Sequence, residues 1–587
     1  HFNEMHSGDR PDTVQDKHAE YVSAAQNREI FAEYKKKYSG ILFRFLGALF
    51  FLVLLFFFEN DRLLGITMPA IFDREQYPLV YTLFDLQLVL LSGAMIWRSV
   101  RTGIRAIFRG RPIPESITGF LFLACIVYTA VIASLCPMHG LQLYNFPIGL
   151  AVLFELCYEF MNLRREIMSF KIVSSKKLKY AVDAIAPKDG EAERKMFAEY
   201  ISDDPALFRI KRTAFVESFF ARTETYPRTQ RILRAVLPAV LLIILAFFAA
   251  KFILTGDLYE SLTVAYITML LTLPSCAFIA FSYPMYRASG FAYKKDSAMI
   301  GEASLGEYAD ASVVSFDDKE VFPARGVRVR NVKVYGENRI DHVIYAAASV
   351  FHVVGGPLAE VFETATGELG YAENVKLTRL DRDGIEARVD GGTVLIGRAP
   401  FINRYGYAVA LNESEKSMEE TGDASILYIA YDNNVAAKLY IQYSVEPDFE
   451  IVLKQLYRQG VCVGIKTSDP NIDDHLLSCK IKMSKYPVKI IKCAEPKETA
   501  IIVDRLSSGI VSKSSAKALL QTLAICDRVL SASRTNNVLG VVSILLGMAA
   551  MAFCIVSGMA VTLAPVWIAL YQLFWIIPVI AISRYYI

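Results

Sequence analysis

Eight apolar runs, each close to the about 20 residues that cross a bilayer as a helix, constrain this chain most. Of its 587 residues, 53% are hydrophobic and 21% are charged, a composition that excludes both an ordinary soluble protein and a disordered one. The sequence therefore predicts a polytopic α-helical membrane protein with about eight transmembrane helices. The runs occupy residues 41–58, 79–97, 117–136, 141–162, 233–255, 261–284, 538–559 and 562–583.

Basic residues between the runs predict the orientation. Residues 98–114 contain five arginines and no acid, and Arg164 and Arg165 follow the fourth run. Segments rich in Lys and Arg stay on the cytoplasmic side of a membrane. We therefore expect both termini and the two long polar inserts in the cytoplasm, residues 137–140 outside, and the protein in the plasma (inner) membrane.

The two polar inserts differ in length and pattern. The larger, about 286–537, alternates short β-rich runs with helical stretches, which predicts a parallel α/β sheet. The smaller is mostly charged helix with one possible strand at 206–216. The β-rich runs of the larger insert are 311–316, 327–334, 426–431, 436–443 and 461–465, and its helical stretches are 346–365, 448–459 and 516–531.

Charge and cysteine spacing limit the partners. The net charge is only +3, from 63 basic and 60 acidic residues, which gives no reason to expect a nucleic acid. The nine cysteines show no CxxC spacing, so we predict no metal site. The expected partners are the lipid bilayer and a membrane or cell-envelope protein.

The order of segments is four spans, a small insert, two spans, a large α/β insert and two spans. This order resembles the P-type ATPase superfamily, specifically its heavy-metal-transporting (CPx-type) branch. Short stretches carry the same resemblance in the same order along the chain. They are residues 98–112, similar to the branch's amphipathic platform; 302–317, similar to the approach to its phosphorylated aspartate; 385–397, similar to its nucleotide-domain hairpin; 456–469, similar to the segment ending in TGD; and 496–506, similar to the helix with the P-domain lysine.

The resemblance implies a cytoplasmic HAD-like P-domain, an inserted α+β N-domain and a reduced actuator-like insert. The expected segments are a cytoplasmic tail at 1–40, transmembrane helices 1–4 at 41–162, the reduced actuator-like domain at 163–232, helices 5–6 at 233–285, the P-domain at 286–334 and 436–537, the N-domain at 335–435, and helices 7–8 at 538–587.

The motif of the phosphorylated aspartate is altered. The family uses DKTGT, and the matching run from Asp317 to Val321 keeps an aspartate at the nucleophile position, Asp317. Glu320 adds negative charge where a phosphate would dock, which makes Asp317 vestigial in this interpretation. Thr467 and Asp469 stand for the TGD motif. Lys497 stands for the lysine that faces the phosphate.

The resemblance also locates losses in the metal and nucleotide motifs. No acid lies between Asp504 and Asp527, where the family's GDGxND loop would hold Mg²⁺. The family's histidine-proline motif is replaced by Gly356 and Pro357. Of the two glycines in the family's adenine-binding loop, the matching run keeps one, Gly384. The small insert contains no TGE motif.

The transport path has two interpretations. Pro274, Ser275 and Cys276 match the family's CPC-type kink, but a single thiol does not make a soft-metal site. Asp85 and Glu155 lie inside predicted spans, where a carboxylate is costly and suggests a function. The alternative is that such groups belong to the membrane interface.

The sequence therefore predicts a catalytically inactive pseudo-ATPase that acts as a scaffold or a regulatory, binding subunit in the membrane, with no cofactor. The alternative is a divergent ATP-driven transporter of a cation or another substrate that is not a soft metal. Only that alternative requires Mg²⁺ and ATP.

Overall fold

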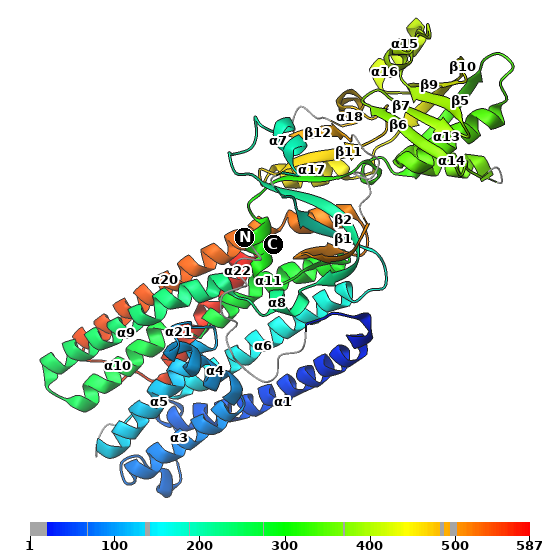
Figure 1. Cartoon of the computed structure of the whole chain (residues 1–587). Coiled ribbons are helices and arrows are strands. Elements are labelled where there is room, and N and C mark those ends of the chain that lie inside the picture. Colours follow the sequence, from blue (N-terminus) through cyan, green and yellow to red (C-terminus); the bar gives the residue numbers. More distant parts are fainter. Residues whose placement is uncertain are drawn as a thin grey trace.

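The computed structural model describes residues 20–66, 68–135, 141–186, 188–273, 275–367, 370–481, 486–493, 502–560 and 562–587. Figure 1 shows a long helical bundle with α/β domains at one end. Residues 137–140, Pro274 and Lys497, which carry predictions made above, lie outside the described residues.

The bundle contains the predicted apolar runs. Within the described residues, seven helices are long and apolar enough to cross a membrane, or eight when α3 and α4, which meet at 92°, count as one bent span. The prediction of a polytopic helical membrane protein is confirmed. The bundle helices are α1 (Asn27–Glu59), α3 (Pro78–Ala94), α4 (Trp97–Phe108), α5 (Ser116–Leu135), α6 (Phe146–Val173), α9 (Pro227–Thr255), α10 (Leu258–Thr272), α11 (Ala277–Lys294), α20 (Cys526–Val556), α21 (Pro565–Phe574) and α22 (Ile576–Tyr586).

The sheet nearer the bundle has eight strands. Its order is β12-β11-β4-β2-β1-β14-β3, and β13 pairs with β2. The strands β12, β11, β4 and β2 run parallel, and the β1 and β3 pairs are antiparallel. The bounds are β1 (Lys179–Ala184), β2 (Ala206–Glu217), β3 (Ser297–Met299), β4 (Ala311–Asp317), β11 (Cys462–Thr467), β12 (Val488–Lys492), β13 (Ile502–Ser507) and β14 (Ile510–Ser512).

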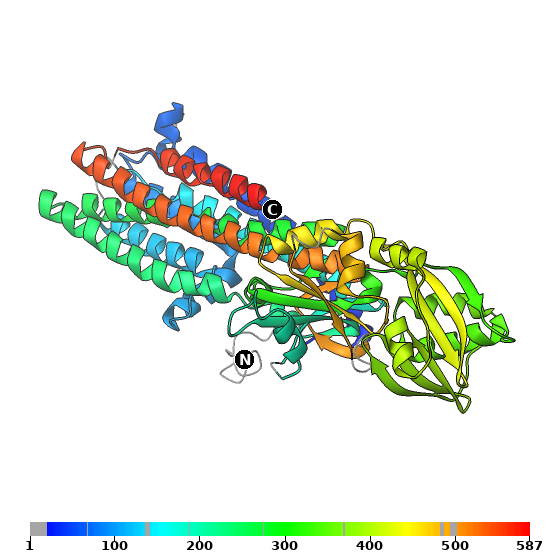
Figure 2. The same cartoon turned by 90° about the horizontal axis from the view of Figure 1, so that it is seen from above.

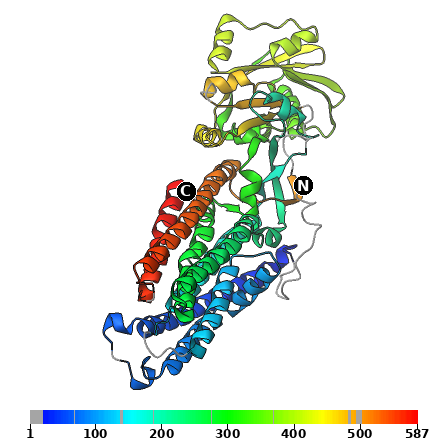
Figure 3. The ribbon, with the colours of Figure 1, turned by 90° about the vertical axis from the view of Figure 1, so that its left-hand side faces the viewer.

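The second sheet lies at the far end from the bundle (Figure 3). Its order is β5-β10-β9-β8-β7-β6, and every pair is antiparallel. The prediction of a parallel sheet was wrong for these strands, because tight turns with positive φ at Asp390 and Asp432 close hairpins. The bounds are β5 (Val327–Val334), β6 (Val375–Asp381), β7 (Gly384–Val389), β8 (Gly392–Gly397), β9 (Ser425–Tyr431) and β10 (Asn434–Tyr443).

Helices pack on both faces of the second sheet. Phe351 and Phe362, from α13 and α14, share a core with sheet residues such as Ile396, whereas Phe401 of α15 packs with Tyr428 on the opposite face. The predicted helix 346–365 is broken at Gly355 and Gly356. The bounds are α13 (Ile340–Val354), α14 (Pro357–Thr366), α15 (Ala399–Arg404) and α16 (Glu413–Thr421).

Shorter helices complete the α/β part and its junction with the bundle. The predicted helix 516–531 is divided into α19 and the start of α20. Their bounds are α2 (Asp61–Leu64), α7 (Glu191–Met196), α8 (Phe219–Thr223), α12 (Ala303–Tyr308), α17 (Phe449–Tyr457), α18 (Asp474–Lys480) and α19 (Ala516–Leu523).

The strands of the small insert belong to the larger insert's sheet (Figure 2). β2 pairs in parallel with β4, with Leu207 opposite Val313, and β1 pairs with β14. The domain division stays a prediction, and the pairing adds that segment 163–232 shares its backbone hydrogen bonds with segments 286–334 and 436–537.

A buried carboxylate fastens the same junction. Glu193 of α7 is fully buried, and its Oε1 lies 3.0 Å from an Arg209 guanidinium nitrogen on β2 and 3.4 Å from Lys466 Nζ on β11. The Ser315 hydroxyl of β4 donates to the same oxygen at 3.1 Å. One side chain of the small insert therefore contacts three neighbouring strands.

Candidate functional site

Polar side chains gather at the carboxyl ends of three parallel strands. Asp317 and Asp318 end β4, Thr467 and Asp469 end β11, and Lys492 ends β12. Side chains that follow parallel strands meet at one edge of a sheet, where such sheets bind ligands. The structure thus brings Asp317, Thr467 and Asp469 to one edge, while their catalytic roles stay predictions.

Asp318, rather than Asp317, is the carboxylate in contact with Thr467. The Thr467 hydroxyl donates to Asp318 Oδ2 at 2.5 Å, and Asp318 is fully buried, whereas Asp317 is half-buried. The sequence interpretation above missed Asp318. A signal was present, because Lys319 directly follows Asp318, in the order of the Asp-Lys pair that opens DKTGT.

Burial controls the electrostatics of this edge. Burial and then the charge of Asp317 raise the pKa of Asp318 well above its usual range. Burial likewise raises the pKa of Asp469 and lowers the pKa of Lys492. The Lys492 ammonium donates to the backbone carbonyl oxygens of Asp469 at 2.6 Å and Pro470 at 3.3 Å. Lys492 therefore lies at this edge beside Asp469. The sequence interpretation did not single out this lysine.

Asp469 is already bonded to protein at the edge where the resemblance implies Mg²⁺. Asp469 Oδ2 accepts from the Tyr443 hydroxyl at 2.8 Å, and its Oδ1 accepts from the Asn471 amide at 2.9 Å. Across the described ranges, no three His, Cys, Asp or Glu side chains converge as ligands for a metal ion. Mg²⁺ takes carboxylate, water and phosphate oxygens in an octahedron. Both Asp469 oxygens are bonded to protein, whereas Asp317 Oδ1 and Asp318 Oδ1 are buried and have no hydrogen-bond partner among the described residues.

The helical layer of the second sheet covers Asp318. Gly356, at the start of α14, lies so close that a Cβ atom on it would be 3.5 Å from Asp318 Oδ2. Lys319 Nζ pairs with Glu360 of α14 at 3.2 Å. On the other side, Arg398 pairs with Asp473 at 2.6 Å. The two sheets therefore meet across the strand edge, and Asp318 lies beneath their contact.

The predicted nucleotide-binding glycines serve packing. A Cβ atom on Gly384 would come within 2.2 Å of the Phe401 ring, and one on Gly397 within 2.6 Å of it. Phe401 is fully buried. Gly356 and Pro357 lie at the Asp318 contact described above. The nucleotide-binding role of Gly356, Pro357 and Gly384 stays a prediction.

In the membrane, the residues matching the CPC kink bond to a neighbouring helix. The Ser275 hydroxyl donates to Gln572 Oε1 at 2.7 Å, and Gln572 Nε2 donates to the Leu270 carbonyl at 3.0 Å. Cys276 is buried as a free thiol. This arrangement ties α21 to the kink between α10 and α11.

Asp85 and Glu155 are not brought together. Asn145, at the start of α6, donates to Asp85 Oδ2 at 2.5 Å and accepts from the Tyr266 hydroxyl at 2.7 Å. Glu155 lies about 15 Å further along α6, from the helical rise. Both Glu155 carboxylate oxygens are buried and lack a hydrogen-bond donor among the described residues. Asp85 thus belongs to a network of helix contacts, and Glu155 stands apart from it.

No family model matches the sequence, and no curated protein matches it. Among solved structures, a zinc-transporting PIB-type ATPase in its E2.Pi state is similar, with 13% identity, coverage of 88% of this chain and 100% of that chain, and a TM-score of 0.46. A structure of a zinc-transporting PIB-type ATPase in another E2 state shows 13% identity, coverage of 87% and 100%, and a TM-score of 0.42. The catalytic domain of the CPx-ATPase CopB-B shows 13% identity, coverage of 34% and 68%, and a TM-score of 0.23.

Proposed function

We propose that this chain is a P-type-ATPase-like membrane protein that does not run a phosphorylation cycle and works by binding, as a scaffold or regulatory subunit for a membrane or cell-envelope protein. The observation that carries the proposal is the closure of Asp318. The carboxyl group is fully buried, faces Thr467 and lies against Gly356. A nucleophile must reach the γ-phosphate of ATP with Mg²⁺ beside it, and the burial of the Asp318 carboxyl group argues against that access.

The joined sheet supports the same proposal. In the resemblance, the small insert carries the glutamate that positions water for hydrolysis of the phosphoenzyme, which requires approach to the phosphorylated aspartate. Here β2 is hydrogen-bonded to β4, and Glu193 contacts three strands of the sheet. Independent movement of the small insert would break these buried contacts.

An ATP-driven transporter is the second candidate, and Glu155 favours it. A fully buried carboxylate in a membrane helix, with no donor to either oxygen among the described residues, is costly and typical of a substrate or proton pathway. Transport driven by ATP would require the closed edge at Asp318 to open.

Complementation of a deletion strain separates the two candidates. We expect Asp317→Asn and Asp318→Asn, alone or together, to restore the wild-type phenotype, because a binding subunit needs no nucleophile. Membrane levels are checked by immunoblot. Loss of function at a normal protein level would reject the inactive scaffold and favour the transporter.

Calorimetric titration with ATP tests the nucleotide side of the proposal. Losing two or three contacts of about 1–2 kcal/mol each weakens affinity by on the order of a hundredfold or more. We therefore expect no binding tighter than millimolar. A dissociation constant in the low micromolar range would contradict this.

A further inference from the structure

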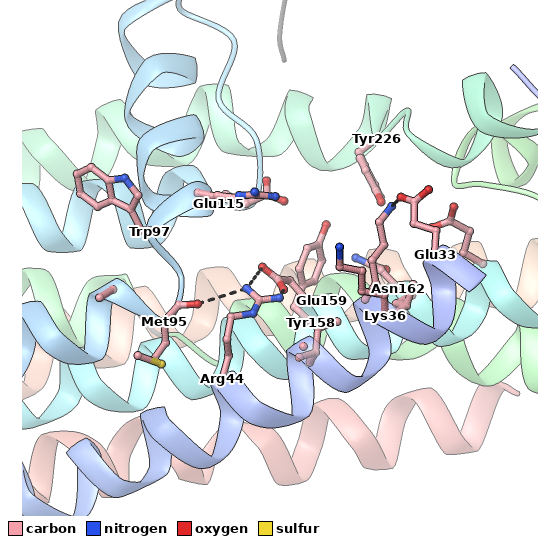
Figure 4. A pocket seen from close by; sticks show the side chains of 17 residues that line it. Glu33, Lys36, Arg44, Met95, Trp97, Glu115, Tyr158, Glu159, Asn162 and Tyr226 are labelled. Carbon is pink, nitrogen blue, oxygen red and sulfur yellow. Dashed lines mark hydrogen bonds and ion pairs between the residues drawn. The ribbon is translucent and has the colours of Figure 1, made fainter. Parts of the chain in front are cut away.

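A cleft of about 1120 Å³ opens in the bundle at the end nearest the α/β domains. Figure 4 shows it between α1, the bend from α3 to α4, and α6, with Arg44 and Glu159 in its interior, Trp97 toward one end and Tyr226 toward the other. It lies outside the sheet edge that holds Asp318 and is independent of the proposed function.

Most acids of this cleft are already neutralised or hydrogen-bonded inside it. Glu159 pairs with Arg44 at 2.6 Å and accepts from the Ser99 hydroxyl at 3.0 Å. Glu33 pairs with Lys37 at 2.9 Å. Two further acids line the cleft: Glu166 accepts from the Tyr34 hydroxyl at 2.8 Å, and Glu115 is half-buried.

The rim adds further positive charge. Lys36 lines the cleft, and Lys35 precedes it on α1. On α4, Arg98 lines the cleft, and Arg101 and Arg105 continue its exposed face at helical spacing. In the part of the chain that the structure describes, Lys36, Arg101 and Arg105 form no ion pair. The residues that line the cleft carry equal numbers of acidic and basic side chains. The net positive charge around the cleft therefore comes from the neighbouring residues Lys35, Arg101 and Arg105.

Apolar surface begins directly beside these cations. On α1, Leu42 and Phe43 are 57% and 74% exposed, a few residues after Lys36. Trp97, which lines the cleft, is 63% exposed, and Phe108 at the end of α4 is 79% exposed. Exposed tryptophan and basic side chains at a helix end mark the level of lipid headgroups. A free phosphate ion would use the cations but not the adjoining apolar wall.

We propose that this cleft binds the headgroup of an anionic phospholipid, whose phosphate is attracted by Lys36 and Arg98 of the lining and by Arg101 and Arg105 further along α4, with an acyl chain along the exposed apolar face of α1. Basic pockets between membrane helices are suited to such headgroups, and a zwitterionic lipid supplies no net charge for the rim.

The test is native mass spectrometry of the delipidated full-length protein, titrated with phosphatidylglycerol or phosphatidylcholine of the same acyl chains. We expect phosphatidylglycerol to be retained preferentially. The variant Lys36→Gln/Arg101→Gln/Arg105→Gln should retain it at least about tenfold more weakly. The matched control is Arg328→Gln/Lys376→Gln/Arg388→Gln, which removes the same charge from exposed positions on the second sheet.

Equal retention of the two lipids, an unchanged triple variant, or an equal loss in the control would overturn the proposal. Inorganic phosphate is added at the lipid's concentration as a competitor. Failure to displace phosphatidylglycerol supports the lipid site, and full displacement would reject it in favour of a plain phosphate site. Thermal unfolding in phosphatidylcholine nanodiscs should give the same midpoint for both variants, because all six side chains are exposed.

Discussion

The side chain of Asp318 is buried, and its carboxyl group accepts a hydrogen bond from the Thr467 hydroxyl. Burial raises its pKa, so the folded state favours the protonated form. The stability that this group contributes is therefore fully present below the unfolded pKa of about 3.9 and is lost as pH rises through the higher folded pKa.

Asp318→Asn should consequently stabilise the protein at neutral pH. Asparagine keeps the shape and the acceptor for Thr467 but cannot ionise, so we expect a gain of about 1–3 kcal/mol near pH 7.5 that vanishes near pH 4. Thermal unfolding at both pH values measures this. The exposed Asp432→Asn serves as control and should change little. A loss of stability at neutral pH would show that the ionised carboxylate is needed for folding.

The position of this residue marks where sequence reasoning fails at the residue scale. The run 311–316 was correctly predicted as a strand, and Thr467 and Asp469 were placed at its neighbour's end. The sequence interpretation assigned the nucleophile position to Asp317, whereas the structure places Asp318 against Thr467. Successive side chains of a strand point to opposite faces, and periodicity cannot show at which residue β4 gives way to the turn. Which of the two aspartates holds the nucleophile position stays a prediction.

At the scale of elements, we expect the contacts of Glu193 to stabilise the packing of α7 against the sheet. Burial disfavours its charge, but Lys466 and Arg209 together hold the pKa of Glu193 below its usual range. Glu193→Gln leaves those cations facing a neutral amide, and removing one partner of a buried charge cluster costs about 3–5 kcal/mol. Denaturant unfolding measures the loss.

Glu191→Gln is the matched control for that change. Glu191 lies two residues away on the same helix and pairs only with the exposed Lys195 at 2.7 Å among its described contacts. Exposed pairs contribute about 0–1 kcal/mol. Equal effects of the two substitutions would mean that the small insert is not held to the sheet through Glu193.

Element types were easier to predict than their pairing. The strands at 327–334 and 426–431 were located because β-branched and aromatic residues cluster there. The turn at Asp432, where φ is positive, joins 426–431 to its antiparallel neighbour β10, and 327–334 pairs with the other edge of β10. The helix 346–365 was predicted as continuous because its apolar pattern does not stop, yet Gly355 and Gly356 adopt φ values of +82° and +81° and divide it.

At the scale of the whole molecule, the two ends of the bundle should lie on opposite sides of the membrane. Cys479 is exposed in the α/β part, and Thr562 is exposed in the turn before α21, at the other end of α20. On intact cells, we expect a membrane-impermeant maleimide to label Thr562→Cys in a Cys479→Ser background. Cys479 itself should react only after permeabilisation. Labelling of both positions without permeabilisation would contradict the predicted orientation.

The central claim of the proposed function is that this protein takes no phosphate from ATP. The direct measurement is incubation of the purified full-length protein with Mg²⁺ and γ-phosphate-labelled ATP, followed by an acid quench and quantification of bound label. The proposal predicts no label above that of the Asp317→Asn/Asp318→Asn double variant. Acid-stable label on the wild-type protein that disappears in Asp318→Asn would contradict the claim and establish a phosphorylation cycle.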